Sequence, residues 1–127
     1  TLLPYVIRYN GTKPEKPGLW PKYQYYNADE RYCDLARAIG LKFDTVQEGV
    51  QKFAQAVHDL GIEIGMEMNF KSQNVDEKAW EENLEKLAYL AYEDQCSPAN
   101  PRVPMIQDMI DIMHAAYECT VIEYENH

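Results

Sequence analysis

Apolar residues recur at alternating intervals of three and four along the chain, and this pattern predicts amphipathic helices. The first two apolar faces consist of Ala28, Tyr32, Leu35 and Ile39, and of Val46, Val50, Phe53, Val57 and Leu60. Gly40 and Gly61 follow these faces, and each is expected to end its helix because glycine adopts left-handed backbone angles without strain. Thr45 and Glu48 have the spacing of a capping box, which predicts the start of the second helix.

Two further helices are predicted nearer the C-terminus. Their apolar faces consist of Trp80, Leu84, Leu87 and Ala91, and of Ile106, Met109, Ile110, Met113 and Ala116 or Tyr117. Asp76 is expected to cap the first of them, and Pro104 stands at the start of the second, where a missing N–H group does no harm. Residues 62–70 alternate weakly, which favours an irregular connector with a helical turn over a short strand. The pattern predicts an all-α helical bundle, with a fifth element formed by the opening residues.

The same pattern sets the domain organisation. We expect a connector and strap in residues 1–27, the helices in 28–119, and a polar tail in 120–127 that frays. Residues 12–21 contain three prolines and a glycine and are followed by tyrosines. A strap packed over the helical core is expected there, with the wall of a peptide-binding groove as the alternative. The apolar, uncapped opening favours a fragment of a longer protein over a processed but complete domain.

Composition narrows the classes of function. A chain of 127 residues fits one domain, and its formal net charge of −9 argues against a surface for nucleic acid or anionic membranes. No apolar run approaches the roughly 18 residues of a membrane span, and the opening lacks the features of a secretory signal. Cys33, Cys96 and Cys119 are odd in number and widely spaced, which favours a reducing cytoplasm over a disulfide framework or a zinc knuckle.

The titratable residues suggest no self-sufficient active site, and no catalytic residue is nominated. His58 and His114 lack the spacing of a zinc motif; Asp111 and His114 could share a metal site, but a solvated pair is favoured. Met105, Met109 and Met113 follow one another at helical spacing and are interpreted as core rather than as an adaptable binding face.

Residues 94–102 form the most specialised stretch, a connector between two predicted helices. Pro98 and Pro101 keep the residues before them out of helical geometry, so this connector should hold one shape. Cys96 has no adjacent base, and we expect a buried or pocket-lining thiol rather than a nucleophile. Arg102 could clamp a carboxylate or phosphate, but bonding to helix-terminal carbonyls is favoured.

This connector resembles the C-terminal part of the sequences of the iron-dependent alcohol dehydrogenase family. The residues that carry the resemblance are Asp94, Cys96, Asn100, Pro101, Arg102 and Pro104, followed by the amphipathic C-terminal helix. Residues 2–10 resemble the segment just after the metal-binding histidines of that family. Residues 23–41 are especially similar to the alcohol dehydrogenase half of the bifunctional aldehyde–alcohol dehydrogenases. The resemblance runs from about Leu2 to about Tyr117.

The resemblance implies a function that this chain performs only as part of a larger enzyme. In the family an α/β domain binds NAD, and one Asp and three His of the helical domain hold Fe²⁺, which polarises the alcohol or aldehyde oxygen. These ligands and the NAD domain would lie upstream of Thr1, so the segment alone should bind neither cofactor. Cys96 matches a cysteine that lines the substrate cavity, whereas His58 and His114 match no ligand position. Asn100, Pro101 and Arg102 then form the structural part of the connector.

The resemblance also implies partners and a compartment. We expect the remainder of the same enzyme as the main partner, a homo-oligomer or filament, and a cytoplasmic location. The expected reaction is aldehyde to alcohol, with acetaldehyde to ethanol in fermentation. A free-standing, non-catalytic helical interaction module derived from that enzyme is the alternative, and a metal-binding four-helix protein is a third. The mass of the native protein separates the first two, and stoichiometric iron or zinc would indicate the third.

Overall fold

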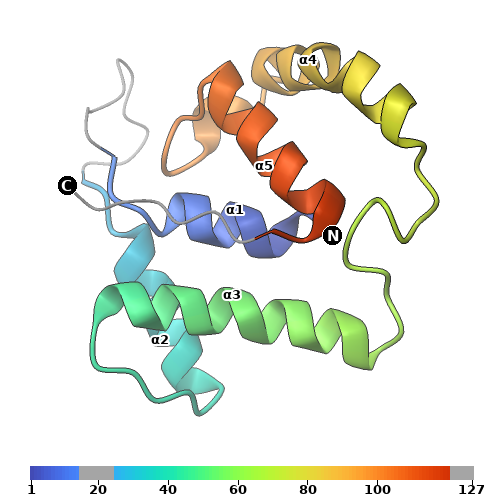
Figure 1. The fold of residues 1–127 in the computed structure, drawn as a ribbon. Helices are drawn as coiled ribbons and strands as arrows, with labels where there is room; N and C mark the ends of the chain where they lie inside the picture. Colours follow the sequence, from blue (N-terminus) through green and yellow to red (C-terminus); the bar gives the residue numbers. More distant parts are fainter. Residues whose placement is uncertain (15–24, 121–127) are drawn as a thin grey trace.

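In a computed structural model of the protein, the structure describes residues 1–14 and 25–120, and they form five α-helices joined by turns (Figure 1). The elements are α1 (Leu3–Asn10), α2 (Ala28–Ala38), α3 (Val46–Glu63), α4 (Glu77–Glu93), the short 3-10 helix η1 (Ser97–Ala99) and α5 (Ile106–Glu118). No strand occurs in these described ranges. The all-α prediction is confirmed, and so is a fifth element at the start of the chain.

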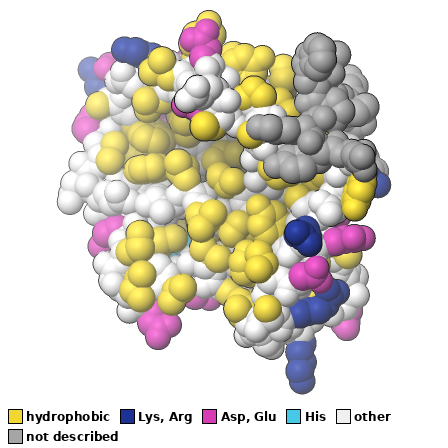
Figure 2. All heavy atoms as spheres, turned by 180° about the vertical axis from the view of Figure 1, so that it is seen from behind, with side chains coloured by type: hydrophobic (Ala, Val, Ile, Leu, Met, Phe, Trp, Pro, Cys, Tyr) yellow, Lys and Arg dark blue, Asp and Glu magenta, His cyan; other side chains and the backbone are white. Residues whose placement is uncertain are grey.

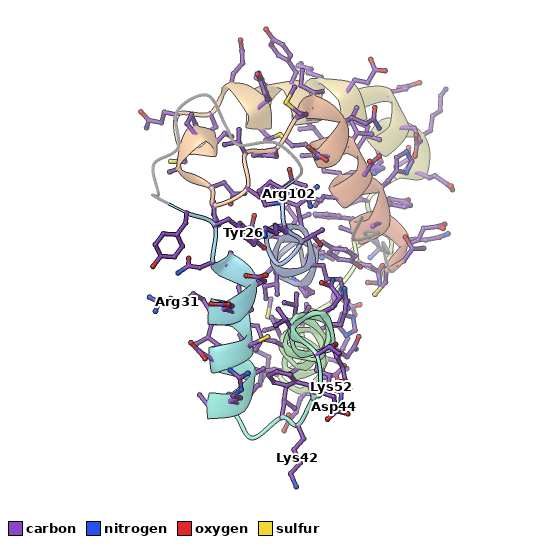
Figure 3. The ribbon with its side chains drawn as sticks, turned by 90° about the vertical axis from the view of Figure 1, so that its left-hand side faces the viewer. Tyr26, Arg31, Lys42, Asp44, Lys52 and Arg102 are labelled. Atoms are coloured by element: carbon purple, nitrogen blue, oxygen red, sulfur yellow. The ribbon has the colours of Figure 1, made fainter. Side chains whose placement is uncertain are left out.

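The short helix α1 lies between two pairs of longer helices. It contacts α2 and α3 on one side and α5 on the other, while α4 packs on α5. Figure 3 shows α1 along its axis, with α2 and α3 below it and α4 and α5 above. The fold therefore consists of two helix pairs held together by one helix of eight residues.

Burial of α1 corrects the expectation that residues 1–27 are only a connector and strap. Its buried residues are Pro4, Tyr5, Ile7, Arg8, Tyr9 and Asn10. Ile7 packs with Cys33, Val50 and Ala54, whereas Tyr5 and Tyr9 pack with Ile112 and the alanines of α5. Helix α1 therefore buries apolar residues in two clusters, together with the polar side chains of Arg8 and Asn10. Residues 15–24 of the expected strap, and most of the expected tail, lie outside the described residues.

Aromatic packing holds α4 in place. Trp80 stacks on Phe70 with ring centroids 4.7 Å apart and on Tyr117 at 5.5 Å. Leu84 completes this cluster on the α4 side. Residues 62 and 63 end α3, and residues 64–70 form the irregular connector that the sequence favoured; Phe70 packs against the core.

The helix starts predicted at Thr45 and Asp76 are confirmed by their hydrogen bonds, whereas Pro104 lies one residue before Met105, the N-cap of α5. The Thr45 hydroxyl accepts from the Glu48 backbone N–H, and the Asp76 carboxylate accepts from the Ala79 N–H at 2.8 Å. The Glu48 carboxylate binds the N–H of Asp44 at 2.8 Å, one residue earlier than in a standard capping box. The pKa of Glu48 is lowered, first by this backbone bond and then by Lys52.

One predicted helix end is confirmed and the other is wrong. Gly40, with φ +84°, follows the end of α2 as expected. Helix α3, however, continues through Gly61 to Glu63, and Gly65, with φ +80°, follows its end. Gly61 is buried, and a Cβ there would overlap the Met68 side chain. Close packing, and not helix termination, therefore accounts for this glycine.

Several positions that were expected in the core are exposed, and small residues are buried in their place. Leu35, Ile39, Val46, Leu60 and Leu87 are exposed, although the apolar pattern placed them on buried faces. The alanines at positions 36, 54 and 88 are fully buried. Met105 is exposed while Met109 and Met113 are half-buried, so the methionine series is only partly core. The helices meet through small side chains, which leaves larger apolar residues at the surface (Figure 2).

The contact between α1 and α3 depends on Gly11. A Cβ at this position would overlap the Val50 side chain, which is fully buried, and would lie 3.0 Å from the Ile7 carbonyl oxygen. We expect Gly11→Ala to destabilise the protein by about 1–3 kcal/mol through overpacking. The exposed neighbour Lys13 provides the control, and Lys13→Ala should stay within about 0.5 kcal/mol. Urea unfolding measures both, and equal midpoints would refute a close approach at Gly11.

Candidate functional site

The connector between α4 and α5 has a fixed local shape. The Asp94 carboxylate accepts from the backbone N–H of Cys96 at 2.8 Å. The Ser97 hydroxyl donates to the Ala91 carbonyl in the last turn of α4 at 2.6 Å. These bonds satisfy groups that a helix end leaves unpaired, and they fix where η1 begins.

Arg102 joins the connector to α1. Its Nη1 donates to the Tyr9 carbonyl at 3.1 Å, and its guanidinium carbon lies 4.1 Å from the Tyr9 ring centroid. A planar guanidinium can stack on a ring and donate at its edge at once, which an ammonium group cannot do. The Tyr9 hydroxyl in turn donates to Asp108 at 3.1 Å, at the start of α5. Figure 3 shows Arg102 beside α1.

Asn100 binds the last residue of α1 through a pair of side-chain amides. The Asn10 Nδ2 donates to the Asn100 Oδ1 at 3.0 Å, and the Asn100 Nδ2 donates to the Asn10 Oδ1 at 2.6 Å. The Asn100 amide also donates to the carbonyl of Arg102. Since Asn10 is only 4 % exposed, these bonds satisfy a side chain that would otherwise be buried unpaired.

Tyr26 closes the same end of α1 from the other side. Its hydroxyl donates to the Asn10 carbonyl at 2.6 Å, and Figure 3 shows it close to the helix end. The pKa of Tyr26 is raised, first by burial and then by the charge of Asp29, so the hydroxyl remains a donor at neutral pH. The C-terminal end of α1 is thus bound by residues from two distant parts of the chain.

Cys96 is exposed at the entrance to η1. The expectation that this thiol is buried within the chain is therefore wrong. Among the described residues, it lines neither of two surface hollows of about 540 and 260 Å³. Pro101 is the connector residue that reaches the smaller hollow, beside Tyr26 and Tyr32. Whether Cys96 lines a cavity completed by other protein stays a prediction.

The histidines take part in separate contacts. His114 Nε2 lies 3.6 Å from Glu81 in the larger hollow, and both side chains are half-exposed. His58 lies beside Cys119, with the Nε2 to Sγ distance 3.3 Å. These two residues are 61 positions apart, so no sequence spacing could have paired them.

The described residues do not provide a metal centre. No group of three or more His, Cys, Asp or Glu side chains in residues 1–14 and 25–120 is placed to hold a metal ion. The donor set for iron that the family resemblance implies does not occur among them, and no reaction step at a metal follows from these side chains. No helix in the described ranges is long and apolar enough to cross a membrane.

Comparison with known proteins gives one consistent family. The C-terminal model of the Fe-containing alcohol dehydrogenase family matches residues 1–117. An aldehyde-alcohol dehydrogenase of Streptococcus pneumoniae is 60% identical over 116 residues, which cover 91% of this chain and 13% of that protein. An aldehyde-alcohol dehydrogenase of Entamoeba histolytica is 54% identical over 116 residues, with the same coverage of both chains. The bifunctional aldehyde-alcohol dehydrogenase of Escherichia coli K12 is 31% identical over 115 residues, covering 88% of this chain and 13% of that protein.

The paired amides of Asn10 and Asn100 should be energetically coupled. We expect Asn100→Ala to destabilise the protein by about 1–3 kcal/mol, because the Asn10 amide stays buried without its partner, and Asn10→Ala by about 1 kcal/mol, because Asn100 is half-exposed and keeps its bond to Arg102. The double change should cost less than the sum of the two single changes by about 1 kcal/mol or more. Urea unfolding of the four proteins measures this coupling. Additive losses would show that the two amides do not stabilise each other.

Proposed function

The chain belongs to the Fe-containing alcohol dehydrogenase family, and we propose that it forms the C-terminal helical segment of an enzyme that reduces an aldehyde to an alcohol. The proposed reaction is acetaldehyde to ethanol with NADH as the hydride donor. The family and the names of the relatives support this assignment. The chain spans 13% of the length of the aldehyde-alcohol dehydrogenases it matches, so the reaction belongs to the larger protein.

Iron and NAD enter the proposal through the family and not through residues of this segment. In such an enzyme Fe²⁺ acts as a Lewis acid on the substrate oxygen, and NAD carries the hydride. Because the described residues hold no cluster of metal ligands, this segment is assigned a scaffold role and no step at the metal.

The observation that carries the proposal is the binding of α1 to the connector. By resemblance, α1 follows the metal-binding segment, whose histidines directly precede residues 2–10. The C-terminal end of α1 is bound to the connector through Arg102 and Asn100, and that connector holds Cys96. We therefore propose that α1 fixes the distance between the metal-bearing segment and one wall of the substrate cavity. Positioning of this kind lowers the barrier by fixing the reacting groups before the reaction starts.

Cys96 is proposed as the residue of this wall that faces the substrate. Its thiol is exposed in the chain, and the hydrogen bonds of Asp94 and Ser97 fix the turn that carries it. A small, weakly polar side chain suits a cavity for a short aldehyde. Asn100, Pro101 and Arg102 then act as positioning residues for the wall.

The remainder of the same enzyme is the proposed partner. Apolar side chains gather over the middle of the face seen in Figure 2, and they include large residues that a folded domain normally buries. On α4, Leu87 and Leu90 are exposed one turn apart, and Leu60, Ile62 and Ile64 are exposed at the end of α3. An NAD-binding domain and the metal-bearing helices would cover such surface. Assembly into homo-oligomers and a reducing cytoplasm, which suits three unpaired cysteines, belong to the same proposal.

The wall assignment predicts an effect of side-chain volume at position 96 in the intact protein that carries this chain. Cys96→Phe should lower kcat/KM for acetaldehyde by about tenfold or more, because the ring would occupy space needed by the substrate. Gln95→Phe, at the exposed neighbouring position, is the matched control and should stay within about twofold. NADH oxidation with acetaldehyde measures both variants. Equal values of kcat/KM for the two variants would refute the assignment of Cys96 to the cavity wall.

The proposed reaction has a test of its own. Treatment of the intact protein with an iron chelator should abolish acetaldehyde-dependent NADH oxidation, and Fe²⁺ should restore it. A chelated protein that keeps full activity would refute the iron-dependent reaction. Absence of any NADH oxidation with short aldehydes in the iron-loaded protein would refute the assigned function itself.

A further inference from the structure

A cluster of polar side chains meets where α1, α3 and the end of α5 come together, away from the connector. Cys119 Sγ lies 3.3 Å from His58 Nε2, and the thiol is exposed. The His58 side chain is 20% exposed, so its ring is largely held by protein. The pair joins the C-terminus of α5 to the second turn of α3 from its end.

The backbone places the Cys119 side chain at this junction. Cys119 caps α5 with φ 66° and ψ 42°, which is a left-handed conformation that few residues other than glycine adopt. Its N–H donates to the Ala115 carbonyl, and the N–H of Thr120 donates to the same carbonyl at 2.9 Å. Two backbone bonds thus end the helix and hold the residue that carries the thiol.

The surroundings of His58 set which ring nitrogen carries the proton. Its Nδ1 lies 3.4 Å from the Asp59 carboxylate, which can only accept. Asp59 also accepts from Gln55 Nε2 at 2.8 Å, and the pKa of Asp59 is lowered, first by Gln55 and then by His58. The carboxylate therefore stays ionised at neutral pH and favours a proton on Nδ1. The lone pair of Nε2 is then directed at the thiol, which is the arrangement of a base beside a nucleophile.

A buried arginine of α1 binds the side chain of Gln55. Arg8, which is 5% exposed on α1, donates to Gln55 Oε1 at 3.4 Å and to Gln51 Oε1 at 2.8 Å. Its bond to the carbonyl oxygen of Gln55 leaves the amide nitrogen of Gln55 to donate to Asp59. The orientation of the imidazole is therefore fixed by a chain of hydrogen bonds that begins at a buried arginine.

Tyr5 of α1 also interacts with Cys119. The residue is 3% exposed, and its pKa is raised, first by burial and then by the neighbouring Cys119. The phenol stays protonated at neutral pH and can donate a hydrogen bond. Cys119 thus has a base and a hydrogen-bond donor among its neighbours.

We propose that Cys119 is an oxidative modification site, at which His58 activates the thiol for reaction with hydroperoxides. His58 Nε2 takes the thiol proton as the sulfur attacks one peroxide oxygen. The S–O bond forms, the O–O bond breaks, and the leaving oxygen takes the proton from the imidazolium and departs as water or an alcohol. Sulfur is oxidised by two electrons to a sulfenic acid, and the peroxide is reduced by two.

The other two cysteines provide internal controls. Cys33 is 1% exposed, and burial raises the pKa of its thiol, so it should not react in the folded protein. Cys96 is exposed in this chain like Cys119, but the hydrogen bonds that the structure shows for it involve its backbone N–H and carbonyl, with Asp94 and Ala99. Because the rest of the enzyme is proposed to cover Cys96, activation of Cys119 is separated from accessibility by the change in its own rate when His58 is replaced.

The test uses the intact protein, reduced, in the presence of a metal chelator that suppresses iron-catalysed oxidation. Hydrogen peroxide is the oxidant, dimedone traps sulfenic acid, and peptide mass spectrometry follows each cysteine over time. We expect Cys119 to be labelled about fivefold or more faster than Cys96, with Cys33 unlabelled. His58→Gln should reduce the Cys119 rate by about fivefold or more. His114→Gln, which changes a half-exposed histidine paired with Glu81, should leave the Cys119 rate unchanged.

Two results would overturn the proposal. One is an equal rate at Cys119 and Cys96 in the unaltered protein, and the other is a Cys119 advantage that survives His58→Gln. Labelling of Cys33 in the variant would reveal loss of the fold. In that case Asp59→Asn, which leaves the imidazole present but removes the charge that orients it, takes its place and should lower the Cys119 rate. An unchanged rate in this second variant would also refute activation by His58.

Discussion

The structure depends on the burial of a short helix, polar side chains included, between two pairs of longer helices. Helix α1 is short, yet it contacts α2, α3 and α5, and it supplies two of the three hydrophobic clusters with Tyr5, Ile7 and Tyr9. Its buried polar side chains are Arg8 and Asn10, and both are hydrogen-bonded to other elements. Such bonds add little net stability, but leaving them unmade would be costly. They therefore select one placement of α1 relative to the connector and to α3.

Local features could be predicted from the sequence because each depends on a few neighbouring residues. The caps at Thr45 and Asp76 and the stop at Gly40 involve bonds within one turn, and the structure shows all three. The buried face of each helix depends on its neighbours, and here the apolar pattern was less informative. Leu35 and Leu87 are exposed, whereas Ala36 and Ala88 are buried, because closely packed helices leave room only for small side chains. The same close packing places Gly61 inside α3 and not at its end.

The residue types of the connector could be interpreted from the sequence, but the partners that they bind could not. The two prolines and the amide of the connector indicate a fixed shape, and bonding of Arg102 to a helix-terminal carbonyl was favoured over an anion clamp. Its partner, Tyr9, is 93 positions away, and no spacing rule could name it. The role of residues 3–10 was missed for a related reason, because their buried side chains include Arg8 and Asn10, residue types that are mostly exposed in folded proteins. Exposure of Cys96 was missed because the sequence pattern does not show how the η1 turn directs its side chain.

The polar contacts around α1 explain how one short helix can connect two sites of different chemistry. Its C-terminal end is bound by Arg102, Asn100 and Tyr26, which fixes the connector. Its middle binds Gln51 and Gln55 through Arg8, and its first turn places Tyr5 against Cys119. A displacement of α1 along its axis would break bonds at all three places at once. The rigidity that our proposal requires of α1 at the connector also supports the contact between the imidazole of His58 and the thiol of Cys119.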